Sequence, residues 1–469
     1  MISKEKLLSF LYNNRFYLLI ICMILVIIFD SNFSLGLTKG SLINTLYKIW
    51  IFFSYVIIFI VTAFLLLAYT KKYTNINRTD FNLRLFYISI ISITIFLSGM
   101  LLITVGQMLI FKTYNNISFY IIPFMSILST IIFSSILSIQ FFKWFLRTKN
   151  YIIFSFVLFF SIYIFSIVIG LIYLNLAFST FPDDIKPKSP RALKANLYNL
   201  DPLLETNLAQ IYNICFFISS ILAWILTVLM LKQYSHRVGI FKFWILVSLP
   251  MIFFILRFGI VSNYLDYVFF FTLPSPTEIH TSIEKAIIAT IINSKIQIVG
   301  IFFAFSFLTI ARKIKNHKLK NNLMISVIGL MLLFSAREFQ IIAYPTFPPG
   351  GLVTISYMSI GSFLLLVGFT SFIRLASIDR KVYDDLIKKI ETDKVIRNII
   401  YSEREIETIN TVKPLMEFAS KWEKENEHLE IKMEDLRDTI NHVISELREK
   451  EDNNYNEKRE SFSSSDSNH

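Results

Sequence analysis

The sequence of 469 residues has little cysteine, histidine, charge or glycine, and each shortage excludes a class of protein. Its two cysteines, Cys22 and Cys215, both lie in apolar runs, which excludes a small domain held by disulfides. Its six histidines lack the spacing of metal ligands, so we expect no metal site and no cofactor. Charged residues make up 17% of the chain, against roughly 25% in an ordinary soluble domain, which argues against a soluble protein. The 13 glycines include no Gly-x-x-x-Gly pair within an apolar segment, so that signal of tight helix packing is missing.

Apolar residues occur instead in runs of about 20, the length that crosses the hydrocarbon core of a bilayer. These runs predict an all-α fold, a polytopic helical membrane bundle with residues 1–374 as its transmembrane domain. The ten predicted transmembrane helices cover residues 15–30, 49–69, 85–111, 118–141, 151–178, 207–231, 240–263, 286–311, 321–344 and 352–374. No small-residue cleavage site follows the first run, so we expect an uncleaved first span rather than a signal peptide.

Lysine and arginine are concentrated in the loops on one side of these spans, as the positive-inside rule requires for the cytoplasmic side. With the N-terminus inside, 19 basic residues fall in the inner segments and 8 in the outer segments. The net charge of +12 does not indicate nucleic-acid binding, because residues 375–469 hold 16 basic and 23 acidic residues and the surplus lies in short loops. We therefore expect a multi-pass plasma-membrane protein in contact with the lipid bilayer, with both termini in the cytoplasm.

Four ionisable residues lie inside the predicted spans, where charge is expensive and usually faces protein, a cavity or a partner. They are Arg257, Lys295, Arg337 and Glu338, which fall on three consecutive spans in the outer half of the bilayer. Glu338 lies about 100° around the helix from Arg337, so we expect it to pair with Lys295 or Arg257 instead. Two positive charges then remain, which would suit an anionic ligand or a lipid headgroup.

Uncharged polar residues extend this cluster into a candidate ligand-binding site, because they share polar helix faces on the same spans. The candidate ligand-binding residues are Arg257, Asn293, Lys295, Gln297, Arg337, Glu338, Gln340 and Tyr344. The cluster is equally compatible with two structural roles. The long cationic side chains can reach the membrane interface, or the group can form a closed network that ties three helices together.

The stretch YPTFPPGG, residues 344–351, predicts a tight outer turn between the last two spans. Pro345 ends the ninth span, and Pro348-Pro349 followed by Gly350-Gly351 turns the chain into the tenth. Because the turn has no charges, it can also dip towards the bundle and cover the polar cluster. A simple turn and a functional plug are both compatible with the sequence.

Beyond Arg374 the chain becomes charged and amphipathic. Residues 375–413 predict a juxtamembrane amphipathic helix, 414–450 a coiled coil, and 451–469 a polar, disordered tail. The coiled coil rests on apolar residues that alternate at spacings of four and three, with one polar Asn in the seam that fixes register in many parallel dimers. We therefore expect a homodimer through Leu415, Trp422, Asn426, Leu429, Met433, Leu436, Ile440, Val443 and Leu447. A helix packed on the protein's own cytoplasmic face is the alternative.

The run TFPPGGLVTISYMSIGSFLLLVGF, followed by a charged helix and YSEREIE, resembles uncharacterised polytopic membrane proteins of archaea, notably of ammonia-oxidising lineages. The resemblance covers roughly residues 334–406. It implies an archaeal plasma membrane as the location, and it brings no activity and no site residues.

Two functions fit these features. The first is a membrane sensor or scaffold that couples an outward-facing polar pocket to a cytoplasmic coiled coil and through it to a protein partner. The alternative is a transporter or channel for a small solute, such as an anion, that uses the intramembrane Arg/Lys/Glu cluster. We expect no enzymatic activity and no catalytic residues, because the spans show no acid, histidine or Ser–Lys pair in a catalytic arrangement.

A peptide of residues 400–450 tests the coiled coil. It should form a helical dimer, because nearly five heptads exceed the length at which such seams become stable. Circular dichroism and sedimentation equilibrium measure helix content and mass. A monomeric, unfolded peptide would contradict the prediction.

Overall fold

The computed structural model describes residues 15–36, 45–74, 81–178, 184–185, 202–232, 317–336 and 347–378, with isolated positions within 239–252 and 301–312. Contacts divide the chain into two compact units, Met1–Glu403 and Arg404–His469, and every described residue belongs to the first. The predicted coiled coil at 414–450 and tail at 451–469 lie outside the described residues, as does the predicted juxtamembrane helix beyond Ile378.

Seven helices among the described residues are long and apolar enough to cross a membrane, which identifies the chain as a helical membrane protein. They are α3 (Thr45–Thr74), α4 (Phe81–Phe111), α5 (Asn116–Thr148), α6 (Tyr151–Phe178), α8 (Pro202–Lys232), α14 (His317–Ser335) and α16 (Leu352–Ile378).

The first predicted span corresponds to α2 (Arg15–Gly36), whose apolar part, Ile20–Asp30, is shorter than the other seven. Most of the predicted spans at 240–263 and 286–311 lies outside the described residues, so the predicted number of ten stays a prediction. The observed helices run past several predicted ends. For example, α5 continues to Thr148, where Lys149 in the left-handed conformation donates its N–H to the carbonyl of Phe145.

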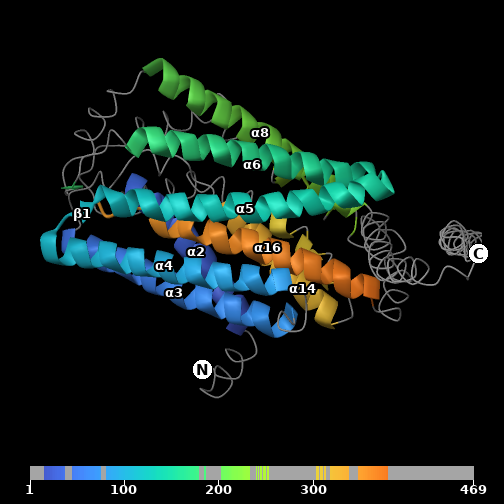
Figure 1. Ribbon diagram of the computed structural model, residues 1–469, viewed down its shortest axis with the longest axis horizontal. Coiled ribbons are helices and arrows are strands. Elements are labelled where there is room, and N and C mark those ends of the chain that lie inside the picture. The colour runs from blue at the N-terminus through green and yellow to red at the C-terminus, as the bar shows by residue number, and fades with distance from the viewer. Residues whose placement is uncertain are drawn as a thin grey trace, which may run out of the picture. The chain divides into compact units, whose positions relative to one another are not determined.

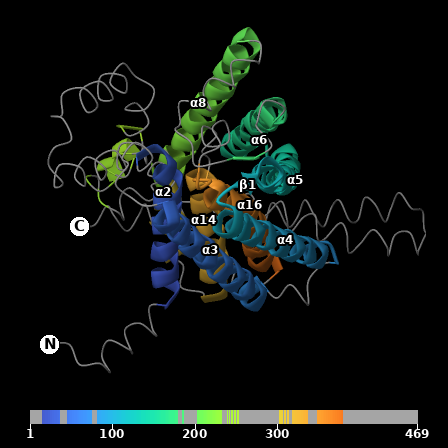
Figure 2. The same ribbon diagram turned by 90° about the vertical axis from the view of Figure 1, so that its left-hand side faces the viewer.

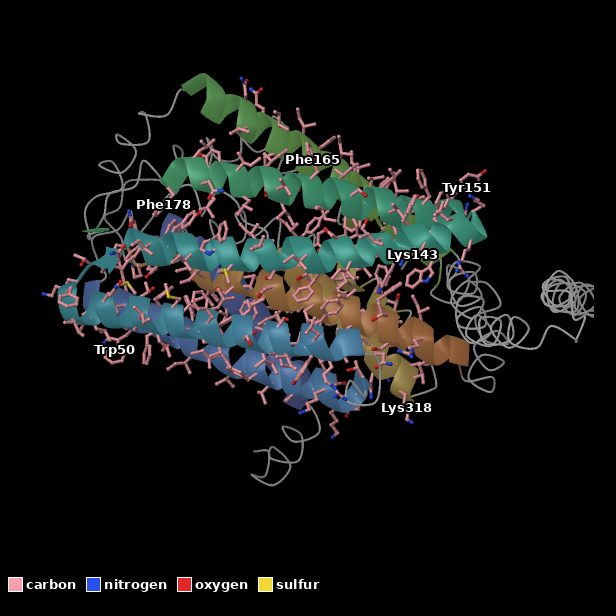
Figure 3. The ribbon with its side chains drawn as sticks, viewed as in Figure 1. Trp50, Lys143, Tyr151, Phe165, Phe178 and Lys318 are labelled. Atoms are coloured by element: carbon pink, nitrogen blue, oxygen red, sulfur yellow. The ribbon has the colours of Figure 1, made fainter. Side chains whose placement is uncertain are left out.

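Successive helices run in opposite directions, so residues far apart in the chain meet at the two ends of the bundle. Figure 3 shows Trp50 and Phe178 towards one end and Lys143, Tyr151 and Lys318 towards the other. The first end also carries the two-residue strands β1 (Tyr114–Asn115) and β2 (Asp184–Ile185), which pair antiparallel. We call this end the β1 end; the positive-inside pattern predicts that it is the outer one.

Helix α16 forms the core of the described bundle. It packs against α2, α3, α4, α5 and α14, and Figures 1 and 2 show it enclosed among them. Every residue from Leu352 to Phe369 is buried, whereas α3 and α4 bury well under half of their most apolar stretches. The remaining surface of α3 and α4 carries exposed leucine, isoleucine and aromatic side chains such as Trp50 and Ile103, which suits contact with lipid tails.

The two most buried helices, α14 and α16, are also the two least apolar of the seven. In a soluble protein the most buried helices are the most apolar ones. The order is reversed here because the surrounding solvent is lipid and not water. Lipid demands apolar side chains on the outside, while a helix inside the bundle can carry serine, threonine and asparagine that bond to protein. Along α16 the buried polar residues are Thr354, Ser356, Ser359, Ser362 and Ser371.

Three glycines bring α14 and α16 into backbone contact. A Cβ added to Gly329 of α14 would lie 2.4 Å from the backbone nitrogen of Leu365. One added to Gly361 would lie 2.9 Å from the nitrogen of Leu333, and one added to Gly368 2.6 Å from the nitrogen of Ser326. Only glycine permits these approaches, because every other residue has a Cβ where the neighbouring backbone runs.

Replacing Gly329 with alanine should destabilise the protein by about 1–3 kcal/mol, because the methyl group forces the two helices apart. Gly99→Ala and Gly106→Ala in α4 are matched controls, since a Cβ at either position meets nothing within 4 Å. Both should be neutral or stabilising by up to about 1 kcal/mol, through the higher helix propensity of alanine. Thermal unfolding in detergent measures the difference, and equal effects at the three positions would contradict the packing.

Candidate functional site

The eight residues of the candidate ligand site predicted from the sequence cannot be placed, because all of them lie outside the described residues. They are Arg257, Asn293, Lys295, Gln297, Arg337, Glu338, Gln340 and Tyr344. The structure neither brings them together nor separates them. The described residues do contain an ionisable group inside the bundle, at the β1 end, which the predicted site did not include.

That group is the carboxylate of Asp30 on α2, which has no exposed surface. Its Oδ2 accepts hydrogen bonds from the backbone N–H of Thr354 at 2.8 Å and from the Thr354 hydroxyl at 2.9 Å. The hydroxyl also lies 3.3 Å from the carbonyl oxygen of Ile27, one turn before Asp30. Asp30 and Thr354 therefore join α2 to α16 through both backbone and side chain.

The position of Asp30 follows from the N-terminus of α16. The first amide groups of a helix lack partners within the helix, and inside a membrane bundle no bulk water can replace them. Asp30 supplies an acceptor from another helix, and its backbone carbonyl also accepts the N–H of Gly351 at 3.1 Å. The same end of a helix attracts negative charge, because the backbone dipoles point their positive ends there.

The second carboxylate oxygen of Asp30 does not accept a hydrogen bond from α16. Oδ1 is buried and has no hydrogen-bond partner, and within the described part of the chain Asp30 makes no ion pair. Native proteins satisfy the large majority of buried polar atoms, so an orphaned carboxylate oxygen needs an explanation.

A second polar pair lies one turn further along α16. The Tyr357 hydroxyl shares a hydrogen bond of 2.6 Å with Thr62 Oγ1 of α3, and the Tyr357 ring contacts Phe59 edge-to-face at 4.8 Å between centroids. Asp30 exerts an electrostatic effect on Tyr357 and on Tyr55 of α3. The carboxylate is thus surrounded by groups of three helices, α2, α3 and α16.

The turn Phe347–Gly351 encloses this site. Gly351 has a positive φ of 81°, as the sharp entry into α16 requires, and Gly350 N–H donates to the carbonyl of Pro348 at 2.9 Å. All five residues of the turn are buried. The ring of Phe347 stacks on Tyr114 of β1 at 6.1 Å, and burial raises the pKa of the Tyr114 hydroxyl well above its usual value. A turn is present over residues 347–351, as the sequence predicts, and it lies within the protein rather than in solvent.

On the other side of α16, helix α5 makes a comparable contact. Ser126 Oγ donates a hydrogen bond of 2.6 Å to the carbonyl of Ile355, which lies in the first turn of α16. Most other buried hydroxyls bond only within their own helix, as Thr70 does to Leu66. The start of α16 is therefore where side chains of neighbouring helices converge.

Chemically, one carboxylate with one open oxygen can bind a proton or a small cation. The described residues contain no group of three or more His, Cys, Asp or Glu that could hold a metal ion. Asp30 could have been found from the sequence, because it is an acid at the end of an apolar run. Like Glu338, such an acid is a candidate functional residue. The partner of Asp30 could not be found in this way, since Thr354 lies 324 residues further along the chain.

Comparison of the chain with known protein families, with curated proteins and with solved structures finds no match. The function must therefore be argued from the residues of this chain alone.

Replacing Thr354 with valine removes the hydroxyl donor to Asp30 and keeps the shape of the side chain. We expect a loss of about 1 kcal/mol in the free energy of unfolding, because the carboxylate loses one of its two bonds to α16. Thr370→Val on the same helix is the control, since the Thr370 hydroxyl bonds only to carbonyls of α16 itself. Thermal unfolding of the two variants should differ, and equal stabilities would contradict a structural role of the Asp30–Thr354 contact.

Proposed function

We propose that this protein is a non-enzymatic membrane sensor or scaffold, in which α16 links a polar site at the β1 end to the cytoplasmic segment. The observation that carries the proposal is the continuity of α16. A single helix runs from Leu352, beside Asp30, to Ile378, where the charged amphipathic sequence begins. A change at its start is therefore transmitted along one rigid element.

The packing of α16 supports this role. Because α16 touches five other helices, among them α14 at backbone distance, a shift of α16 must be accompanied by a rearrangement of the bundle. Closely packed interiors respond to small displacements by moving as rigid bodies between discrete arrangements. A buried helix of this kind suits the coupling of two sites better than a lipid-facing helix does.

The predicted charge cluster belongs to the same proposal. In the sequence, Arg337 and Glu338 follow directly after Ala336, which is buried just beyond the end of α14, and α14 packs on α16. We propose that these residues, with Lys295 and Arg257, form the outward-facing polar pocket, and that the coiled coil at 414–450 dimerises and presents the signal to a cytoplasmic protein. The location proposed is the plasma membrane, with both termini in the cytoplasm.

Transport is the second candidate, and one observation favours it. Besides Asp30, buried side-chain oxygens without a hydrogen-bond partner occur within the described helices α4, α5 and α14, at Ser98, Ser134, Gln140 and Asn322. Polar groups of this kind line solute pathways in transporters. The close glycine contact of α14 with α16 speaks against it, because it leaves no space between these two helices.

The relay role of α16 can be tested with spin labels on the full-length protein. A label at Ser445→Cys, which lies outside the predicted seam, reports the distance between the two coiled-coil helices of a dimer by pulsed electron paramagnetic resonance. Thr354→Val should shift or broaden this distance distribution, although Thr354 lies at the opposite end of α16. Thr370→Val, which is nearer to the label along the chain, should leave the distribution unchanged.

An unchanged distribution in Thr354→Val would overturn the relay. If such a protein also carried solute into vesicles, transport would become the better proposal. The absence of any dipolar coupling in the unmodified chain would overturn the dimer.

A further inference from the structure

The Oδ1 oxygen of Asp30 is buried and has no hydrogen-bond partner, while Oδ2 already accepts two hydrogen bonds from Thr354. The side chain is fully buried; the five residues of the turn Phe347–Gly351 at this end are also buried, and Phe347 stacks on Tyr114. If Oδ1 carried a negative charge, that charge would face protein without a partner in the described structure.

No described residue neutralises the carboxylate. Among the described residues, the titratable groups that interact electrostatically with Asp30 are Tyr55 on α3 and Tyr357 on α16, and Tyr357 also interacts with Cys22 on α2; none of the three is a cation. Lys48 near the start of α3 and Lys112 at the end of α4 are the basic residues of this end among those described. Neither makes an ion pair with Asp30.

An unpaired buried anion costs far more than an unpaired neutral hydroxyl, because the cost of removing a full charge from water greatly exceeds that of removing a dipole. The carboxyl group therefore lowers the free energy of the folded protein by binding a cation. A sodium ion needs several oxygen ligands, whereas a proton needs one. Among the described residues of α2, α3 and α16, Oδ1 of Asp30 is the one buried side-chain oxygen without a hydrogen-bond partner, so the site fits a proton.

We propose that Asp30 is a proton-binding site: in the folded protein its Oδ1 carries a proton while Oδ2 accepts the two hydrogen bonds from Thr354. Release of this proton to water leaves a carboxylate, which binds the N-terminus of α16 more strongly, because both the helix dipole and the two donors favour the charged form. Proton binding and release therefore change the strength of the contact between α2 and α16.

The consequence for signalling rests on the proposed function. If α16 is the relay of a sensor, the stimulus at Asp30 is proton concentration, and the two protonation states correspond to two strengths of the α2–α16 link. If α16 is not a relay, the proton still binds at Asp30. A decisive experiment therefore detects the proton itself and not the output.

Infrared difference spectroscopy of the full-length protein in lipid nanodiscs tests the proposal. Unmodified protein at pH 5 should show the C=O stretching band of a protonated carboxylic acid, and Asp30→Asn should lose that band. Thr354→Val should retain the band at a shifted frequency, because one hydrogen bond to Oδ2 is gone. Thr370→Val, which leaves Asp30 untouched, should show the band unchanged.

Labelling all aspartates with ¹³C at the carboxyl carbon provides a measurement that needs no variant, in case Asp30→Asn does not fold. A protonated aspartic acid band that moves with the isotope supports the proposal. Carboxylate bands alone between pH 5 and 8 would overturn it. Carboxylate bands that change when sodium is replaced by a bulky organic cation would overturn it in favour of a sodium site.

Discussion

The amide groups at the start of α16 need an acceptor inside a bundle that excludes water, and the arrangement of this end follows from how that need is met. Asp30 of α2 supplies the acceptor, with a bond of 2.8 Å to the backbone of Thr354. To place it there, α2 must lie against the first turn of α16, and the turn Phe347–Gly351 must fold inwards. A carboxylate is a strong acceptor, but it brings a charge into the bundle. The same residue therefore stabilises the helix and creates a group that can respond to its surroundings.

The centre of the bundle illustrates how lipid reverses the usual distribution of residues. In water, the most apolar segments are buried, whereas here the most polar spans, α14 and α16, are enclosed by more apolar ones. Without a hydrophobic force between helices, close packing and hydrogen bonds hold the core together. Gly329, Gly361 and Gly368 provide the close packing, and Ser126, Thr62 and Thr354 provide bonds between helices. A helix held in this way on every side moves only together with its neighbours, which is the physical basis of the proposed relay.

Sequence reasoning predicted features that depend on one segment, such as the position of a helix. It did not predict features that depend on two segments, such as a contact between helices. It located eight of the described helices, because about 20 apolar residues in a row have few alternatives to a transmembrane helix. It missed the α14–α16 contact, because it looked for Gly-x-x-x-Gly within one helix. The observed contact places Gly361 and Gly368 of α16, seven residues apart, against the backbone of Leu333 and Ser326, and Gly329 of α14 against the backbone of Leu365. It also passed over Asp30, whose polar partner is distant in the chain, and the site that it did propose lies outside the described residues.

By itself, the sequence determined that this chain is a bundle of membrane helices, because hydrocarbon leaves the backbone of each apolar run no partner but itself. It also determined the turn before α16, through two prolines and two glycines in succession. Only the tertiary structure decided which helix lies at the centre and which glycines lie against a neighbouring backbone. It also decided that Asp30 of α2 lies at the start of α16. These are properties of pairs of segments, and the pairing depends on the fit of whole helix surfaces, which no single run of residues contains.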